Sequence, residues 1–157
     1  MKNIVTTLEE ILKINSPTGY TIEVINYVEN LLKDPKLFIK KTNKGSLLVS
    51  FDESPELVIS GHIDTLGAMV KHVNEDGTIA ITKIGGLELN SFEGEYVTVR
   101  NYKGEFFRGT FLLNNPASHV NKSINETKRS LDNMSIRLDE LVRNIADVKK
   151  LGIDVGD

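Results

Sequence analysis

One short apolar run constrains the fold of this chain more than any other stretch. Leu57-Val58-Ile59-Ser60 passes directly into Gly61-His62-Ile63-Asp64. A continuous apolar run bounded by glycine predicts a buried strand, and open α/β sheets hold ligand sites at such strand ends. His62 is therefore a candidate metal ligand, and Asp64 would accept a hydrogen bond from its second ring nitrogen. The alternative is a strand-end histidine that bonds only to backbone.

The residues before this run predict two helices and a hairpin. Apolar residues recur at helical spacing from Asn3 to Ile14 and from Ile22 to Leu32, with Thr21 placed as an N-cap. Apolar segments at 37–42 and 46–51 flank an Asn-Lys-Gly turn that is typical of a β-hairpin. We expect both helices to pack on a sheet.

After Asp64 the pattern changes to short strand-like runs separated by turns rich in Gly, Asn and Asp. We expect strands near 67–73, 78–84, 96–101, 105–113 and 134–138, then a short helix at 145–151 that stops at Gly152. Strands at such regular spacing favour a small barrel or sandwich. The sequence therefore predicts a second, β-rich lobe.

Composition excludes several function classes. The formal net charge is only −3, with both signs interspersed, so nothing steers the chain toward nucleic acid. The absence of cysteine leaves His, Asp and Glu as metal ligands. Glu9 and Glu10 interrupt the N-terminus before a signal peptide can develop, and no apolar run is long enough to span a membrane. We expect a cytoplasmic protein.

Other candidate residues favour ordinary structural roles. His72 lies on an expected surface strand and His119 in an expected loop. Ser60 lacks a nucleophile elbow, and Gly85-Gly86 lacks the Lys-Ser/Thr step of a phosphate loop. A polysaccharide hydrolase would need a poised acid–carboxylate pair, and nothing in the sequence around Glu93-Gly94-Glu95 makes one of these carboxyls an acid.

Several segments together resemble one family. They are Ser16-Pro17-Thr18-Gly19-Tyr20 after the first helix, Gly61-His62-Ile63-Asp64, Ile84-Gly85-Gly86, and Asp147 to Leu151 leading to Gly152-Ile153-Asp154-Val155-Gly156-Asp157. Their order is similar to that in metallopeptidase family 42, the glutamyl and deblocking aminopeptidases, which are related to tetrahedral aminopeptidases and are sometimes labelled endoglucanases. The resemblance spans essentially the whole chain.

The resemblance implies an α/β zinc-peptidase-type catalytic lobe, with helices on a mixed sheet, interrupted by a small barrel-like β domain used in oligomerisation. Mapped here, residues 1–66 start the catalytic lobe, 67–152 form the inserted domain and 153–157 return toward the lobe. It implies two divalent metal ions, zinc or cobalt, with His62 as the first metal-binding histidine and Asp64 as its catalytic support. Metal-activated water would release N-terminal residues from peptides, in a homo-oligomer.

The resemblance also implies that this chain alone lacks most of the site. In such proteins a bridging aspartate, a Glu-Glu pair, a further aspartate and a distal histidine follow beyond the position of Asp157, which is not itself a ligand. A catalytic zinc normally takes three protein ligands. We therefore expect a truncated N-terminal portion that is inactive by itself and binds no metal tightly. The alternative is a noncatalytic oligomerisation or interaction module built on the β domain.

Overall fold

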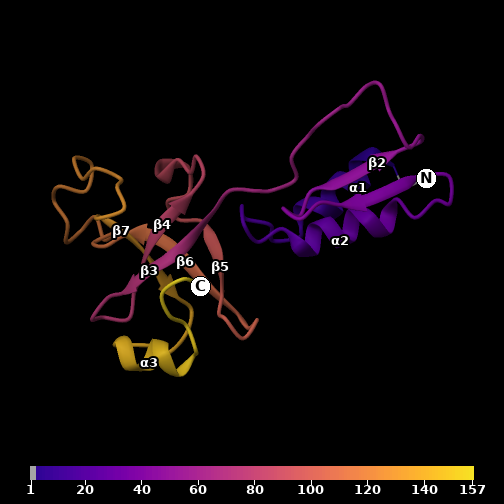
Figure 1. The fold of residues 1–157 in the computed structure, drawn as a ribbon. Coiled ribbons are helices and arrows are strands. Elements are labelled where there is room, and N and C mark those ends of the chain that lie inside the picture. Colours follow the sequence, from indigo (N-terminus) through magenta and orange to yellow (C-terminus); the bar gives the residue numbers. More distant parts are fainter. Residues whose placement is uncertain (1–2) are drawn as a thin grey trace. The chain divides into compact units, whose positions relative to one another are not determined.

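A computed structural model describes residues 3–157 and divides the chain into two compact units, with the boundary after Gly67. The first unit holds two helices and a hairpin, and the second holds a β-sheet with a short helix (Figure 1). This mixed α/β content is the coarse fold class that the sequence predicts.

Both predicted helices of the first unit are present. Helix α1 spans Ile4–Leu12 and is capped by Asn3, whose side chain accepts a hydrogen bond from the Val5 N–H at 3.0 Å. Helix α2 spans Ile22–Leu31 and begins after Thr21, whose hydroxyl makes no capping hydrogen bond. The N-terminal cap thus anchors α1, whereas α2 depends on its packing.

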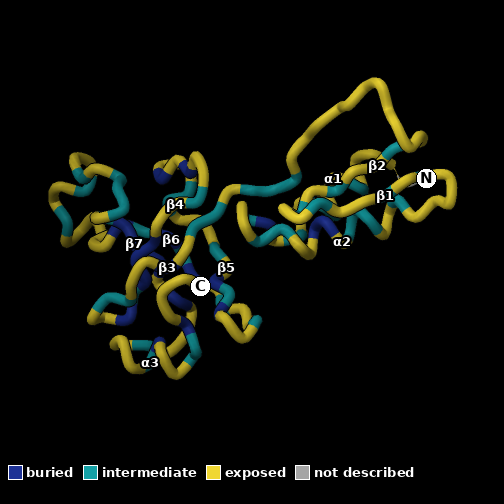
Figure 2. The backbone as a smooth tube through the Cα atoms, in the orientation of Figure 1, coloured by how far each residue is buried: buried dark blue, intermediate teal, exposed yellow. Residues whose placement is uncertain are grey.

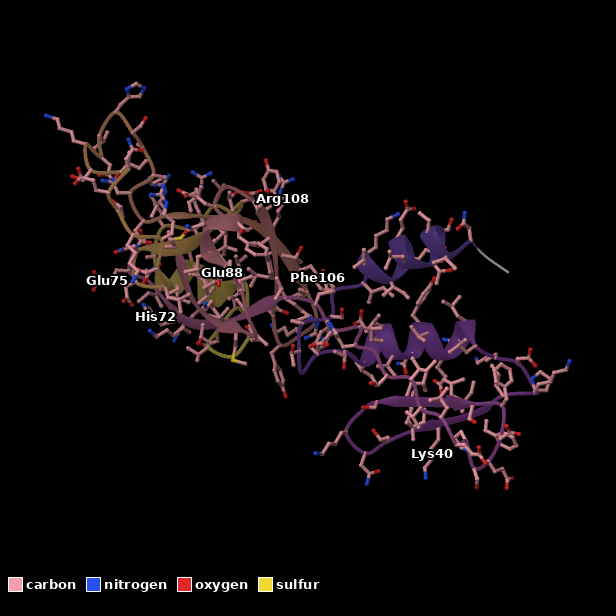
Figure 3. The ribbon with its side chains drawn as sticks, turned by 90° about the horizontal axis from the view of Figure 1, so that it is seen from above. Lys40, His72, Glu75, Glu88, Phe106 and Arg108 are labelled. Carbon is pink, nitrogen blue, oxygen red and sulfur yellow. The ribbon has the colours of Figure 1, made fainter. Side chains whose placement is uncertain are left out.

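The predicted hairpin follows α2. Strands β1 (Phe38–Lys41) and β2 (Leu47–Ser50) pair antiparallel. Lys41 Nζ lies 2.7 Å from both Asn26 Oδ1 and Glu29 Oε2 of α2, so this face of the hairpin meets the helix. Lys40, the next residue in the strand, points away from the helices (Figure 3), as strand alternation requires. The two strands make an antiparallel sheet, and the mixed sheet stays a prediction.

The prediction of a buried strand at 57–60 is wrong for this structure. Residues 57–64 have no regular secondary structure, and Ile59 is 90% exposed. A strand needs a neighbour to accept and donate its backbone hydrogen bonds, and no strand of residues 3–157 pairs with this run. The apolar residues at 57–60 would suit a buried strand. Residues 3–157, however, provide no strand that pairs with this run and no side chains that bury it.

A five-stranded antiparallel sheet forms the second unit, and it curls into a half-barrel. Its strands are β3 (Gly67–Val73), β4 (Ile79–Ile84), β5 (Tyr96–Arg100), β6 (Phe106–Leu113) and β7 (Met134–Leu138). The order β3-β4-β7-β6-β5 leaves β3 and β5 at the edges. All five predicted strands are confirmed, as an open curled sheet.

The core of this unit lies inside the curl (Figure 2). Its buried members include Val70, Ile79, Ile81, Val99, Phe111, Leu113, Met134, Ile136, Leu138, Val148 and Ile153. Helix α3 (Ile145–Lys150) contributes Val148 and is followed by Gly152 at φ +74°, the left-handed C′ position that the sequence predicts. The buried Asn101 donates to the Leu151 carbonyl at 2.9 Å, which fastens the end of α3 to the sheet.

The last residues of the chain pair with the first strand of the same unit. The Val70 N–H donates to the Asp157 carbonyl at 2.8 Å, and the Gly156 N–H donates to the Val70 carbonyl at 3.0 Å. Residues 153–157 thus lie within the second unit. Their return toward a catalytic lobe stays a prediction.

Within residues 3–157, no helix has the length and apolar character needed to cross a membrane.

Candidate metal centre

His62 and Asp64 lie together in the first unit, as the sequence predicts from their spacing. In an extended chain, side chains two residues apart point to the same side. His62 Nδ1 lies 3.0 Å from Asp64 Oδ1 and 3.2 Å from the Asp64 carbonyl oxygen. The carboxylate oxygen and the backbone carbonyl oxygen of Asp64 can only accept hydrogen bonds, so the hydrogen of this pair lies on Nδ1 of His62. In the neutral ring, Nε2 then keeps a free lone pair.

The Asp64 carboxylate has a donor on each oxygen. Its Oδ1 accepts from His62, and its Oδ2 accepts from the Thr18 hydroxyl at 2.5 Å. The Thr18 hydrogen bond, followed by that of His62, holds the pKa of the Asp64 carboxyl below its ordinary value. Asp64 is therefore ionised at neutral pH and acts only as an acceptor.

The loop around Ser16 holds this arrangement to the rest of the unit. The Thr65 N–H donates to the Ser16 carbonyl at 2.9 Å, and the fully buried Ser16 side chain donates to the Ile63 carbonyl at 3.2 Å. Pro17 and Thr65 form a parallel bridge. A Cβ on Gly67 would lie 2.4 Å from Pro17 Cβ, so glycine is needed where the loop approaches.

The pair meets the chemical requirements of a metal-binding histidine. Such a histidine donates one ring N–H to a carboxylate and uses the other nitrogen for the metal. His62 does the first through Nδ1, and its side chain is 86% exposed, so Nε2 is accessible to an ion. The donor set therefore fits a divalent metal that accepts imidazole nitrogen.

The other sequence candidates belong to the second unit. His72 is exposed on β3, and His119 is exposed in the segment after β6. Among residues 3–157, no group of three or more His, Asp or Glu side chains is arranged to hold a metal ion. His62 and Asp64 are the two candidate residues that the structure brings into contact.

Sequence reasoning did not find the hydroxyl that completes the pair. Thr18 lies 46 residues before Asp64 in the sequence, and no periodic pattern links the two positions. The signal available was the Ser16-Pro17-Thr18-Gly19-Tyr20 segment, which marks a turn and a family resemblance but not a contact with Asp64.

Residues 45–157 match the sequence profile of the M42 glutamyl aminopeptidases. The Bacillus subtilis (strain 168) protein YhfE, provisionally named an aminopeptidase, is 43% identical over 153 residues. That alignment covers 96% of this chain and 44% of YhfE, so the chain spans less than half the length of this relative.

Solved structures share the fold. A TET aminopeptidase from a marine-sediment Thaumarchaeota archaeon superposes with a TM-score of 0.83 at 18% identity, over 98% of this chain and 42% of that one. The Pyrococcus horikoshii TET1 peptidase, which can assemble into a tetrahedron or a large octahedral shell, superposes with a TM-score of 0.72 at 19% identity, over 98% and 45%.

Proposed function

The chain belongs to the M42 glutamyl aminopeptidase family, and from that premise we propose that it supplies part of the active site of a metal-dependent aminopeptidase. His62 is a metal ligand in this proposal, and Asp64 is the carboxylate that supports it. The observation that carries the proposal is the 3.0 Å contact between His62 Nδ1 and Asp64 Oδ1, which leaves Nε2 available.

Two divalent metal ions, zinc or cobalt, would supply the Lewis acidity that peptide hydrolysis needs. The residues of this chain would set the tautomer and the orientation of one metal-binding ring. Asp64 keeps the proton of the neutral ring on Nδ1 and raises the basicity of Nε2. His62 then presents that nitrogen in one orientation, because the carboxylate it bonds to is held at both oxygens.

We propose that the remaining ligands come from residues outside these 157. A catalytic zinc takes three protein ligands, whereas residues 3–157 bring together no group of three or more His, Asp or Glu side chains that could hold a metal ion. The relatives it matches are more than twice as long, since it covers 44% of YhfE. The chain by itself is then expected to release no N-terminal residues from peptides, even with zinc or cobalt added.

The incomplete cover of the first unit supports the same proposal. The apolar run at 57–60 is exposed, and β1 and β2 carry exposed apolar side chains such as Phe38 and Leu48. We propose that these segments belong to the larger mixed sheet of a zinc-peptidase-type catalytic lobe, in which 57–60 pairs as a strand. Its end would then carry His62 to the sheet edge, where such folds hold ligands.

A cobalt titration of the chain tests the ligand role directly. Co²⁺ is paramagnetic and broadens the NMR signals of a ring that binds it, so the His62 ring signals should broaden first. His62→Asn should remove this response. His72→Asn and His119→Asn are the matched controls, because both rings are exposed in the second unit. Equal broadening of all three rings would contradict the assignment.

The activity test needs the protein extended to the length of its relatives. There, His62→Ala should abolish metal-dependent release of N-terminal residues, with His72→Ala as the control. Retained turnover in His62→Ala would refute the proposed role. Clear turnover by the 157-residue chain alone would refute the proposal that further ligands are required.

We also propose that the β domain, residues 67–152, mediates homo-oligomer formation. Support comes from the TET1 neighbour, which can assemble into a tetrahedron or a large octahedral shell, and from the separate core of the second unit. The second candidate function is a noncatalytic oligomerisation or interaction module built on this domain. It predicts that residues 67–152 alone fold and self-associate, which light scattering would measure. A monomeric product would count against both.

A further inference from the structure

The loop that carries Thr18 is held in place without the help of its side chain. The Ser16 carbonyl accepts from Thr65 N–H, the Ser16 hydroxyl donates to the Ile63 carbonyl, and Pro17 bridges to Thr65. These contacts hold the backbone just before Thr18, and the Tyr20 N–H donates to the Pro17 carbonyl at 2.8 Å, which closes the turn that contains Thr18. Removing the Thr18 hydroxyl would therefore leave the loop where it is, so that any effect on Asp64 reports the hydroxyl itself.

The two carboxylate oxygens of Asp64 have different partners. Thr18 donates to Oδ2 at 2.5 Å, and His62 donates from Nδ1 to Oδ1 at 3.0 Å. A carboxylate turns about its χ2 torsion over a broad, roughly two-fold profile. The Thr18 hydrogen bond restrains that rotation, because turning the group would break the charge-assisted bond to Oδ2. Oδ1 is thereby kept facing the imidazole.

We propose that Thr18 is a positioning residue, whose hydroxyl locks the Asp64 carboxylate so that His62 stays in the Nδ1–H tautomer with Nε2 directed outward. This inference rests on the proposed function, since a directed Nε2 matters only if His62 binds a metal. Thr18 itself touches no ion. It acts through Asp64, as a carboxylate support that is itself hydrogen-bonded does in metal sites generally.

Substitution of Thr18 in the 157-residue chain tests the role. Thr18→Val keeps the branched shape and removes the hydroxyl, Thr18→Ser keeps the hydroxyl, and Thr21→Val is the matched control, because the Thr21 hydroxyl makes no capping hydrogen bond. The His62 tautomer is read in metal-free protein from ¹⁵N chemical shifts of the ring, under conditions where the ring is neutral. Co²⁺ affinity is read by titration of the ring signals.

Thr18→Val should raise the Nε2–H share of His62 several-fold and weaken Co²⁺ binding about tenfold. Thr18→Ser should restore both values to those of the unaltered chain, and Thr21→Val should change neither. A folded Thr18→Val with the original tautomer ratio overturns the proposal. If amide spectra show that Thr18→Val does not fold, Thr18→Ala, which adds no bulk, replaces it with the same expected results.

The two readouts separate this inference from the proposed function. If Co²⁺ leaves the His62 signals of the unaltered chain unchanged, the ligand role fails, and the inference that rests on it fails as well. If Co²⁺ binds at His62 but Thr18→Val changes neither the tautomer nor the affinity, the ligand role stands and the role of Thr18 is refuted.

Discussion

The two units of this chain bury apolar residues to very different extents. The second unit has a continuous core to which all five strands and α3 contribute, with Ile79, Val148 and Ile153 fully inaccessible to solvent. Among the described residues of the first unit, the buried hydrophobic residues are Val24 and Ile25 of α2. Figure 2 shows this contrast as a dark interior in one unit and a largely exposed chain in the other.

The larger buried core and the candidate site residues therefore lie in different units. The candidate site residues, His62 and Asp64, lie on the unit with little core of its own. Neither unit, over residues 3–157, brings together three or more side chains that could hold a metal ion. Apolar surface that stays exposed marks an incomplete packing arrangement or a binding surface. Four pairs of substitutions, with one residue of each pair in each unit, test this comparison.

The largest expected effect comes from truncating one isoleucine in each unit. Ile79→Ala opens a cavity in the core of the second unit and should lower the free energy of unfolding by about 2–5 kcal/mol. Ile59→Ala removes a side chain that is 90% exposed and should change it by less than about 0.5 kcal/mol. Urea unfolding measures both, with hydrogen exchange of β6 amides for Ile79→Ala and of α2 amides for Ile59→Ala. Equal costs would show that the run at 57–60 is packed.

Two glycines give the next effect. A Cβ on Gly109 would lie 2.6 Å from Ile136 Cγ2 and 2.8 Å from the Arg137 carbonyl oxygen, so β6 and β7 would have to move apart. Gly109→Ala should cost about 1–3 kcal/mol. Gly61→Ala is the control in the first unit, because nothing lies within 4 Å of its Cβ. Thermal unfolding compares the two variants. A Gly109→Ala variant with an unchanged melting temperature would contradict the close packing of β6 and β7.

Substitution of the helix N-cap residues should also destabilise the two units to different extents, with a smaller difference than the glycine substitutions. The Asn144 side chain accepts from the Asp147 N–H at 3.0 Å at the start of α3. Asn144→Ala should therefore destabilise the second unit by about 1 kcal/mol. Thr21→Ala, at the start of α2, should have almost no effect, because no side-chain cap is lost. Hydrogen exchange of the first-turn amides measures both, and a larger loss in Thr21→Ala would reverse the expectation.

The smallest effect is on the pH dependence of stability. Hydrogen bonds from Lys150 and from the Arg143 N–H lower the pKa of Asp147 in the folded protein. A lowered folded pKa adds stability that is present above the unfolded value of about 3.9 and is lost as pH falls through the folded value. Asp147→Asn should thus show a smaller drop in melting temperature between about pH 6 and about pH 3. An unchanged drop would mean that Asp147 contributes nothing.

The same reasoning applies to Asp64 in the first unit, whose pKa is lowered mainly by Thr18. Asp64→Asn should reduce the loss of stability on acidification in the first unit alone. If Asp64→Asn altered the second unit instead, the division between the two would need revision.

Local sequence signals predicted the second unit well. Its turns contain Gly77 and Gly104, which adopt positive φ, and its strands alternate, so both turn chemistry and burial could be read from neighbouring residues. The contact of His62 with Asp64 was also predictable, because two-residue spacing places both side chains on one side of an extended chain.

Two features depended on distant residues and could not be predicted locally. The run at 57–60 has the composition of a buried strand. Whether it is buried depends on the segments that pack against it, and no described strand pairs with it. The Thr18 contact with Asp64 joins positions 46 residues apart through the fold of the Ser16 loop. Periodicity describes one element at a time and is silent on such pairs.

The pairing of Val70 with Gly156 and Asp157 has a mechanical consequence. A pulling force applied across the second unit, between its first strand and its last residues, would load these two hydrogen bonds before any other part of the sheet. The β4–β7 and β6–β7 pairings involve neither Val70 nor residues 156–157. Tension applied between these two ends of the unit would therefore reach the core only after this pair has separated.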